Sequence, residues 1–309
     1  MTRSCMVFYS AFDDFDAWRE ALQPEGIELC RSEEVVDADN VRSALVWKPP
    51  HGFFGGFRNL QLVVNLGAGV DALVGRDDLP DVPITRLSDP RMARMMAGFV
   101  LFAVMRYARD IPQFEKAQRD RRWHYIHPKD PADMTVGVLG LGELGLESAR
   151  EVARQGYRVL GWSRTQKAVE GISCSSGAEA LVSVLSQSDI VVCMLPKTPE
   201  TDGLLDAAMF RAMKQGAFFI NVSRGSVVDE PALITALQSG QLGGATLDVF
   251  AKEPLSPDSP LWTMDNVLIT PHLASIALPS SAAMQIGDNV RRIARNELVL
   301  SRIDPQRGY

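Results

Sequence analysis

Three residues in the C-terminal half of the chain have side chains of the types used in acid–base catalysis. They are Arg224 in "NVSRGSVVDE", Glu253 in "LDVFAKEPL" and His272 in "LITPHLAS". A histidine is the side chain best suited to give a proton near neutral pH, and a glutamate hydrogen-bonded to it would stabilise the imidazolium form. An arginine can hold a carboxylate with two parallel hydrogen bonds and polarise an adjacent carbonyl. This set of groups suits the reduction of a 2-oxo acid by hydride from a nicotinamide.

Each of these residues follows an apolar, strand-like segment, at 217–223, 244–250 and 266–270 respectively. Loops at the carboxyl ends of parallel strands line the ligand site of an open α/β sheet. Three successive strands would therefore deliver one polar group each to the same edge. Taken singly, Arg224 could cap a turn, Glu253 could be solvated and His272 could be a loop histidine. Their joint placement favours catalysis.

The same half of the chain contains the other elements of a doubly wound parallel sheet. Helical segments at 143–155 and 206–214 fall between apolar strands, and three further strands precede Arg224, at 135–140, 157–162 and 189–195. Six strands alternating with helices are typical of a Rossmann-type sheet.

A second, smaller α/β series comes first in the chain. Its predicted strands are 5–9, 26–30, 44–48, 60–67 and 82–87. A long helix is predicted from Pro90 to about Arg109, an irregular polar connector over 110–134, and a last helix over roughly 281–300. A single terminal helix cannot form its own core, so we expect it to return to the first domain. The prediction is two doubly wound α/β domains: a smaller, discontinuous, flavodoxin-like substrate domain at 1–90 and 280–309, and a Rossmann dinucleotide-binding domain at 91–279.

A glycine-rich turn joins the first strand of the Rossmann series to its first helix. The spacing is Gly140-x-Gly142-x-x-Gly145. In this strand–turn–helix context the glycines permit a tight turn, close approach of a pyrophosphate and close helix–sheet packing, while the helix N-terminus favours phosphates. A turn without a ligand, or the glycine-rich loop of a methyltransferase, would share the pattern. A methyltransferase would leave Arg224, Glu253 and His272 unexplained.

The stretch "RVLGWSRTQK" indicates which dinucleotide would bind. An acid about 20 residues past the glycines usually holds the ribose 2′-hydroxyl of NAD. Here the chain has Ser163, Arg164 and Thr165 instead. A guanidinium and two hydroxyls can bind a 2′-phosphate that a carboxylate would repel, so the sequence predicts NADP(H) over NAD(H). The alternative is a solvated turn.

Bulk composition excludes several other classes of protein. The chain has 309 residues, 46% of them hydrophobic, and a net charge of −6, which disfavours nucleic acid or an anionic membrane as the main partner. Its longest apolar run, 95–105, is too short to span a bilayer, and the N-terminus lacks a signal-peptide pattern. The four cysteines have no metal-like spacing. We therefore expect reduced thiols, no metal site and a cytoplasmic location.

The motifs "LGLGELG", "NVSRGSVVDE", "GATLDVFAKEPL" and "ITPHLAS" resemble those of the D-isomer-specific 2-hydroxyacid dehydrogenase family, and the resemblance spans nearly the whole chain. Six further motifs are similar to the family's glyoxylate and hydroxypyruvate reductases: "LVWKPP", "NLGAGVD", "GWSRT", "LPKTPET", "SPLW" and the ending "RGY". This resemblance implies NADPH-dependent reduction of glyoxylate to glycolate and of hydroxypyruvate to D-glycerate. It also implies a homodimer whose interface includes the helix 91–109 and the connector.

The resemblance implies roles for individual residues as well. Arg224 would bind the substrate carboxylate and carbonyl, and Glu253 would tune His272 as the acid/base. The backbone of Ala68 and Gly69 would bind the carboxylate, and Trp47 would line the pocket, although a core aromatic would look the same. Asp248 would hold the nicotinamide carboxamide, and Pro196 and Thr198 would lie along the adenosine. The implied cofactor residues are Gly140, Gly142, Glu143, Leu144, Gly145, Ser163, Arg164, Thr165, Leu195, Pro196, Thr198, Val222, Ser223 and Asp248.

Other functions on the same fold stay open. A related dehydrogenase could act on a larger 2-oxo acid, on phosphoglycerate or on formate. A non-catalytic NAD(P)-sensing regulator is an alternative from another class, because the fold alone does not determine activity. The complete Arg, Glu and His set argues against the regulator.

Overall fold

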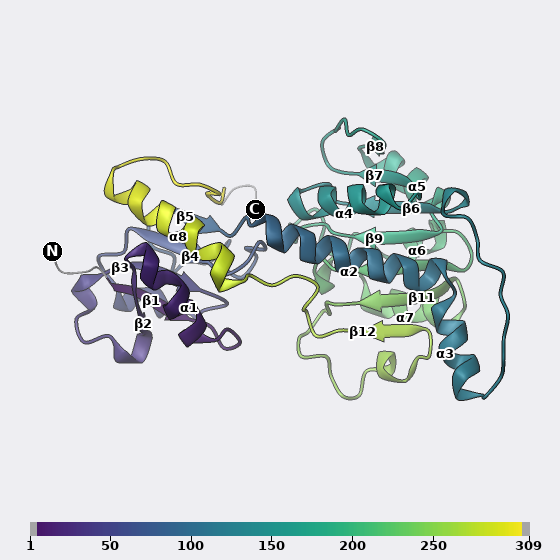
Figure 1. Ribbon diagram of the computed structural model, residues 1–309, viewed down its shortest axis with the longest axis horizontal. Helices are drawn as coiled ribbons and strands as arrows, with labels where there is room; N and C mark the ends of the chain where they lie inside the picture. The colour runs from purple at the N-terminus through teal and green to yellow at the C-terminus, as the bar shows by residue number, and fades with distance from the viewer. Residues whose placement is uncertain (1–4, 305–309) are drawn as a thin grey trace. The chain divides into compact units, whose positions relative to one another are not determined.

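The computed structural model describes residues 5–304, which form two compact units. Within the described residues, the split unit consists of 5–92 together with 276–304, and the central unit consists of 93–275. Figure 1 shows both units and labels most of their helices and strands. Each unit has its own parallel sheet and its own hydrophobic core, so each is described separately.

The split unit contains a five-stranded parallel sheet in the order β2-β1-β3-β4-β5. This is the flavodoxin-like order. Helix α1 (Phe15–Leu22) contacts α8 (Pro279–Ala294), so the last helix of the chain returns to this unit (Figure 1). The strands are β1 (Cys5–Tyr9), β2 (Glu28–Arg31), β3 (Val41–Val46), β4 (Leu62–Asn65) and β5 (Ile84–Arg86).

The central unit contains a seven-stranded parallel sheet in the order β12-β11-β10-β9-β6-β7-β8. Counted from β6, this is the Rossmann order 3-2-1-4-5-6 with one strand added beyond it. The chain reverses its direction of travel across the sheet between β6 and β9, the switch point at which such sheets bind ligands. The strands are β6 (Thr135–Leu139), β7 (Arg158–Trp162), β8 (Ser173–Ser175), β9 (Ile190–Cys193), β10 (Ala217–Asn221), β11 (Leu242–Leu247) and β12 (Val267–Ile269).

Helices cover both faces of this sheet, and most of its strands are accordingly apolar along their whole length. Apolar residues of α2 (Pro90–Ala108) and α4 (Glu143–Arg154) share one core with the strands. Those of α5 (Ala178–Gln187), α6 (Ala207–Ala212) and α7 (Glu230–Gln238) share the other. Over the described residues, no helix combines the length and hydropathy that a bilayer span requires.

Helix α2 is fastened to the sheet by Tyr107. Its ring stacks on Phe218 of β10 with centroids 4.3 Å apart, and its hydroxyl lies 2.8 Å from Oγ1 of Thr246 on β11. Burial raises the pKa of Tyr107 to about 12. The phenol therefore stays neutral and hydrogen-bonded at ordinary pH.

Three expectations about elements and one about cysteines were wrong. The connector predicted as irregular begins with α3 (Ile111–Arg119), a mostly polar helix tied to α2 by the bidentate pair of Arg106 and Glu115. Strand β8 was not predicted, and α8 ends at Ala294 instead of near residue 300. Cys5 and Cys30 were expected as reduced thiols, but the adjacent strands β1 and β2 bring their sulfurs together as a disulfide.

Candidate active site

His272 and Glu253 form a hydrogen-bonded pair at the carboxyl edge of the central sheet. Nδ1 of His272 lies 2.9 Å from Oε2 of Glu253, and the two side chains are 28% and 25% exposed. The other carboxylate oxygen accepts a hydrogen bond from the backbone N–H of Phe250 at 3.3 Å. Because the carboxylate fixes the proton on Nδ1, Nε2 is the ring nitrogen left to exchange a proton with a substrate.

Arg224 lies just beyond β10, in a turn shaped by buried polar groups. The side-chain oxygen of Asn221 accepts hydrogen bonds from the backbone N–H and the hydroxyl of Ser223, at 3.1 and 2.8 Å. The Arg224 guanidinium donates to the Ser223 carbonyl at 2.7 Å. Strands β10, β11 and β12 are neighbours and parallel, so the segments carrying Arg224, Glu253 and His272 leave the sheet at the same edge.

The turn that carries His272 is built around Asp248, which is 2% exposed. The Asp248 carboxylate accepts hydrogen bonds from the Thr270 hydroxyl at 2.6 Å and from the backbone N–H groups of Leu273 and Ala274 at 2.9 and 3.0 Å. The backbone N–H of His272 donates to the Asp248 carbonyl at 2.9 Å. His272 has a φ of +56°, in the left-handed region that residues other than glycine rarely adopt.

The glycine loop follows β6 and leads into α4. Gly140 has a φ of +102°, and a Cβ there would come within 2.6 Å of the Met194 carbonyl oxygen. A Cβ on Gly145 would overlap the carbonyl oxygen of Gly140, and Gly142 is the N-cap of α4. Glu143, which is exposed, and the half-buried Leu144 begin the helix. The loop keeps its backbone free of side chains at the switch point, as a pyrophosphate site requires.

The segment after β7 supplies the expected hydroxyls and cation. Ser163 is buried and its hydroxyl donates to the Thr165 carbonyl at 2.8 Å, while Arg164 and Thr165 are exposed. Lys167, which the sequence analysis overlooked, donates from Nζ to the carbonyl of Leu141 in the glycine loop at 2.7 Å. Its place in the same loop as Arg164 could have indicated it. The segment therefore brings a second cation to the predicted phosphate side of the site.

The remaining predicted cofactor residues follow β9 and β10, which lie on the side of β6 opposite to β7. Leu195 and Thr198 are buried and follow β9, together with the exposed Pro196, whose carbonyl accepts a hydrogen bond from the Thr201 hydroxyl at 2.6 Å. Val222 and Ser223 are buried and follow β10. All of them lie at the edge that also carries the glycine loop.

In the split unit, the predicted substrate residues gather beyond β3 and β4. Trp47 packs so closely on Gly67 that a Cβ at Gly67 would lie 2.6 Å from the indole ring. Asn65 is fully buried and donates to the carbonyls of Gly67 and Gly69 at 3.0 and 2.8 Å. Sequence reasoning missed Asn65, although it begins the quoted motif "NLGAGVD". This amide fixes the shape of the loop that presents Ala68 and Gly69.

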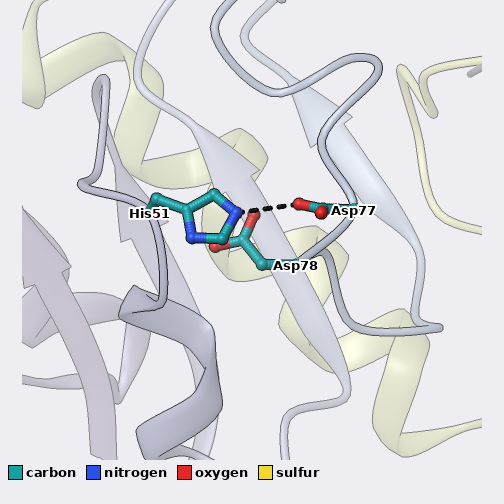
Figure 2. Close-up of side chains that lie close together, drawn as sticks. All are labelled: His51, Asp77 and Asp78. Atoms are coloured by element: carbon teal, nitrogen blue, oxygen red, sulfur yellow. Dashed lines mark hydrogen bonds and ion pairs between the residues drawn. The ribbon is translucent and has the colours of Figure 1, made fainter.

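A second polar cluster in the split unit joins two loops. His51 Nε2 lies 2.8 Å from Asp77 Oδ1, and Figure 2 shows Asp78 beside them. Possible ligand atoms of the three residues lie within 4.8 Å of one another. However, Asp78 already accepts two hydrogen bonds from Arg76, at 2.7 and 2.6 Å, and one from the Gly52 N–H. Arg76 neutralises this carboxylate, and its hydrogen bonds hold the pKa of Asp78 well below the usual range. The cluster is therefore an ion-pair network that links two loops.

Comparison with known proteins identifies the family of the chain. Residues 101–274 match the NAD-binding domain of the D-isomer-specific 2-hydroxyacid dehydrogenases. The chain belongs to that family. This dehydrogenase is 35% identical to a glyoxylate/hydroxypyruvate reductase A from Serratia proteamaculans, over 98% of this chain and 99% of the relative. It is 34% identical to the protein of the same name from Yersinia enterocolitica, over 98% and 99%. The protein is an oxidoreductase.

Solved structures of the family share the whole fold. A D-isomer-specific 2-hydroxyacid dehydrogenase from Xanthobacter autotrophicus Py2, in complex with NADPH and MES, is 60% identical with a TM-score of 0.96, and all of both chains is covered. An NADPH-dependent glyoxylate/hydroxypyruvate reductase from Sinorhizobium meliloti, in complex with NADP and sulfate, is 31% identical with a TM-score of 0.92. That match covers 99% of this chain and 100% of the other. The two-sheet α/β architecture expected from the sequence is confirmed.

Proposed function

We propose that this dehydrogenase reduces small 2-oxo acids with NADPH, converting glyoxylate to glycolate and hydroxypyruvate to D-glycerate. The observation that carries the proposal is the 2.9 Å pair of His272 and Glu253 at the sheet edge that also carries Arg224. The names of the Serratia and Yersinia relatives support the choice of substrates.

The proposed catalytic roles rest on the geometry of this pair and on the family resemblance. His272 gives a proton from Nε2 to the oxygen of the reduced carbonyl, because Nδ1 is held by Glu253. The Glu253 carboxylate accepts the hydrogen bond from Nδ1 and keeps the ring oriented. Arg224 binds the substrate carboxylate and polarises the carbonyl. The family resemblance also implies that the backbone of Ala68 and Gly69 binds a substrate carboxylate and that Trp47 lines the pocket.

The cofactor is NADP(H) in preference to NAD(H). The central unit supplies its site: the glycine loop takes the pyrophosphate, and Ser163, Arg164 and Thr165 take the 2′-phosphate. Lys167 adds positive charge next to the loop. Leu195, Pro196, Thr198, Val222 and Ser223 complete the site at the neighbouring strands. When bound, NADPH supplies the hydride of the reaction. The NADPH complex of the Xanthobacter structure and the NADP complex of the Sinorhizobium structure support this choice.

The test is a steady-state panel of glyoxylate, hydroxypyruvate and larger 2-oxo acids, each with NADPH and NADH. We expect glyoxylate and hydroxypyruvate with NADPH to give the highest kcat/KM. His272→Gln should lower kcat by about 10²- to 10⁴-fold, the usual contribution of a general acid. Glu253→Gln and Arg224→Ala should also lower turnover, Arg224→Ala by more than Glu253→Gln.

The kinetic measurements also distinguish the alternative functions from the proposed one. A preference for a larger 2-oxo acid would retain the mechanism and change the substrate. NADPH binding without turnover of any 2-oxo acid would indicate a regulator. Near-normal kinetics of His272→Gln would remove His272 from the mechanism.

A further inference from the structure

We propose that Asp248 is a positioning residue, whose buried carboxylate holds the turn that presents His272 to the substrate. The proposal rests on the proposed role of His272 as the proton donor. It assigns to Asp248 a task different from the nicotinamide contact that the sequence resemblance implies.

Three successive backbone N–H groups converge on Asp248. The N–H of His272 donates to its carbonyl, and those of Leu273 and Ala274 donate to Oδ1 and Oδ2 of its carboxylate. Consecutive N–H groups around a left-handed residue form a concave anion-binding nest. Nests usually bind an external anion, whereas this one is filled by a side chain of the same chain. The Asp248 carboxylate therefore occupies the place in this turn that an external anion would take.

The turn needs such an anchor because its conformation is strained. His272 adopts a φ of +56° directly after Pro271, and left-handed backbone is unfavourable for residues with a Cβ. Without the carboxylate, three N–H or hydroxyl donors that now point at it would lose their acceptor. The segment would then relax toward a conformation with negative φ at His272, and the imidazole would move with the backbone.

The two carboxylates near His272 have complementary tasks. Glu253 contacts the imidazole ring and sets its orientation and proton position. Asp248 contacts the Thr270 hydroxyl before the histidine and the backbone N–H of Leu273 after it, and so fixes the position of the backbone that carries the ring. Thr270 contributes to the same anchor, since its hydroxyl donates to Asp248 Oδ1 at 2.6 Å.

Asp248→Asn and Thr270→Val test the proposal in the full-length enzyme. Asparagine keeps the shape but replaces one acceptor oxygen with a donor, and valine removes one hydrogen bond. We expect kcat to fall about 10- to 100-fold in Asp248→Asn, as for misplacement of a catalytic group by about 1 Å, and less in Thr270→Val. The Kd of NADPH, measured by fluorescence titration, should change less than threefold in both. Amide exchange of the segment 270–275, followed by mass spectrometry, should become faster.

Asp206→Asn is the matched control. Its carboxylate also accepts two backbone N–H groups, at the N-cap of α6, and lies outside the proposed site. Kinetics and exchange over 270–275 should stay as in the parent enzyme.

Two results would overturn the proposal. A Kd for NADPH that rises in Asp248→Asn while kcat stays unchanged would make Asp248 a cofactor contact. Unchanged kcat and unchanged exchange in both variants would show that the turn does not depend on it. If His272→Gln is fully active, the proposed function itself fails, independently of exchange at 270–275.

Discussion

Arg164 is the residue on which the proposed choice of cofactor depends. It lies beyond the carboxyl end of β7, between the buried Ser163 and the exposed Thr165. The carboxylate of Glu200 interacts electrostatically with the Arg164 guanidinium. The pKa of its carboxyl is lowered, first by a hydrogen bond from Thr198, then by its own backbone, and also by the charge of Arg164. A 2′-phosphate at this place would compete with Glu200 for the guanidinium.

Arg164→Ala should therefore raise the KM for NADPH and leave the KM for NADH nearly unchanged. Loss of a charge-assisted hydrogen bond typically costs 1.5–3 kcal/mol, or roughly 10- to 150-fold in affinity. Arg158→Ala is the control, because Arg158 is exposed at the opposite, amino end of the same strand. An unchanged ratio of the two KM values in Arg164→Ala would contradict the assignment.

At the scale of elements, Tyr107 connects α2 to strands β10 and β11. The burial that raises its pKa to about 12 favours the neutral phenol in the folded state. Since the ordinary value is 10.0, its contribution to stability is complete below about pH 10 and is lost as the pH rises toward 12.

Tyr107→Phe should lower the free energy of unfolding at neutral pH by about 1 kcal/mol, because the hydrogen bond to Thr246 is lost. Between about pH 10 and pH 12 the parent protein should lose more stability than the variant. Urea unfolding across this pH range measures both effects. Other alkaline groups are common to both proteins and cancel in the comparison. A constant difference between the two proteins would contradict the burial argument.

Elements with strong apolar patterns were predictable from the sequence, and weakly patterned ones were not. Every strand that was predicted contains apolar residues that are buried or partly buried, whereas β8 (Ser173–Ser175) is short and partly polar. Helix α3 was missed because, of its nine residues, only Ala117 is buried. Its ion pair with α2 joins Arg106 and Glu115, which are nine residues apart and therefore fall outside the i,i+4 spacing of a single helix.

The candidate site was likewise predictable only in part. Glu253 and His272 could be paired from the sequence because strand order determines where their loops emerge. Lys167 and Asn65 could not, because their partners are backbone carbonyls whose direction depends on the folded turn. The turn around Asp248 could not be predicted either, because it depends on the directions of one hydroxyl and two backbone N–H groups in the folded chain. Cys5 and Cys30 were misjudged because their pairing depends on strands β1 and β2 being neighbours.

At the scale of the whole molecule, exposed apolar side chains on α2 and the connector need an explanation. Phe102 and Met105 on α2 are 51% and 41% exposed, and Trp123 and Tyr125 in the connector are 99% and 74% exposed. Large exposed apolar residues gathered in one part of a chain mark interaction surfaces. We propose that they belong to the interface of a homodimer, as the family resemblance implies.

Size-exclusion chromatography with light scattering should then give a dimer. Met105→Glu and Trp123→Asp should each shift the protein toward the monomer, because they place a charge where apolar surface is buried. Leu298→Asp, at an apolar residue that is 82% exposed in another segment, should leave the mass unchanged. A parent protein that is monomeric at micromolar concentration would contradict the proposal.

The contact of Trp47 with Gly67 has a consequence for redesigning this enzyme. The indole occupies the space that any side chain at Gly67 would need, so the two positions are complementary in size. Alanine at Gly67 alone would displace the ring, whereas a smaller side chain in place of Trp47 would leave room for that alanine. A library that varies Gly67 alone will force the indole ring out of its place. The two positions should therefore be randomised together when a wider substrate range is sought.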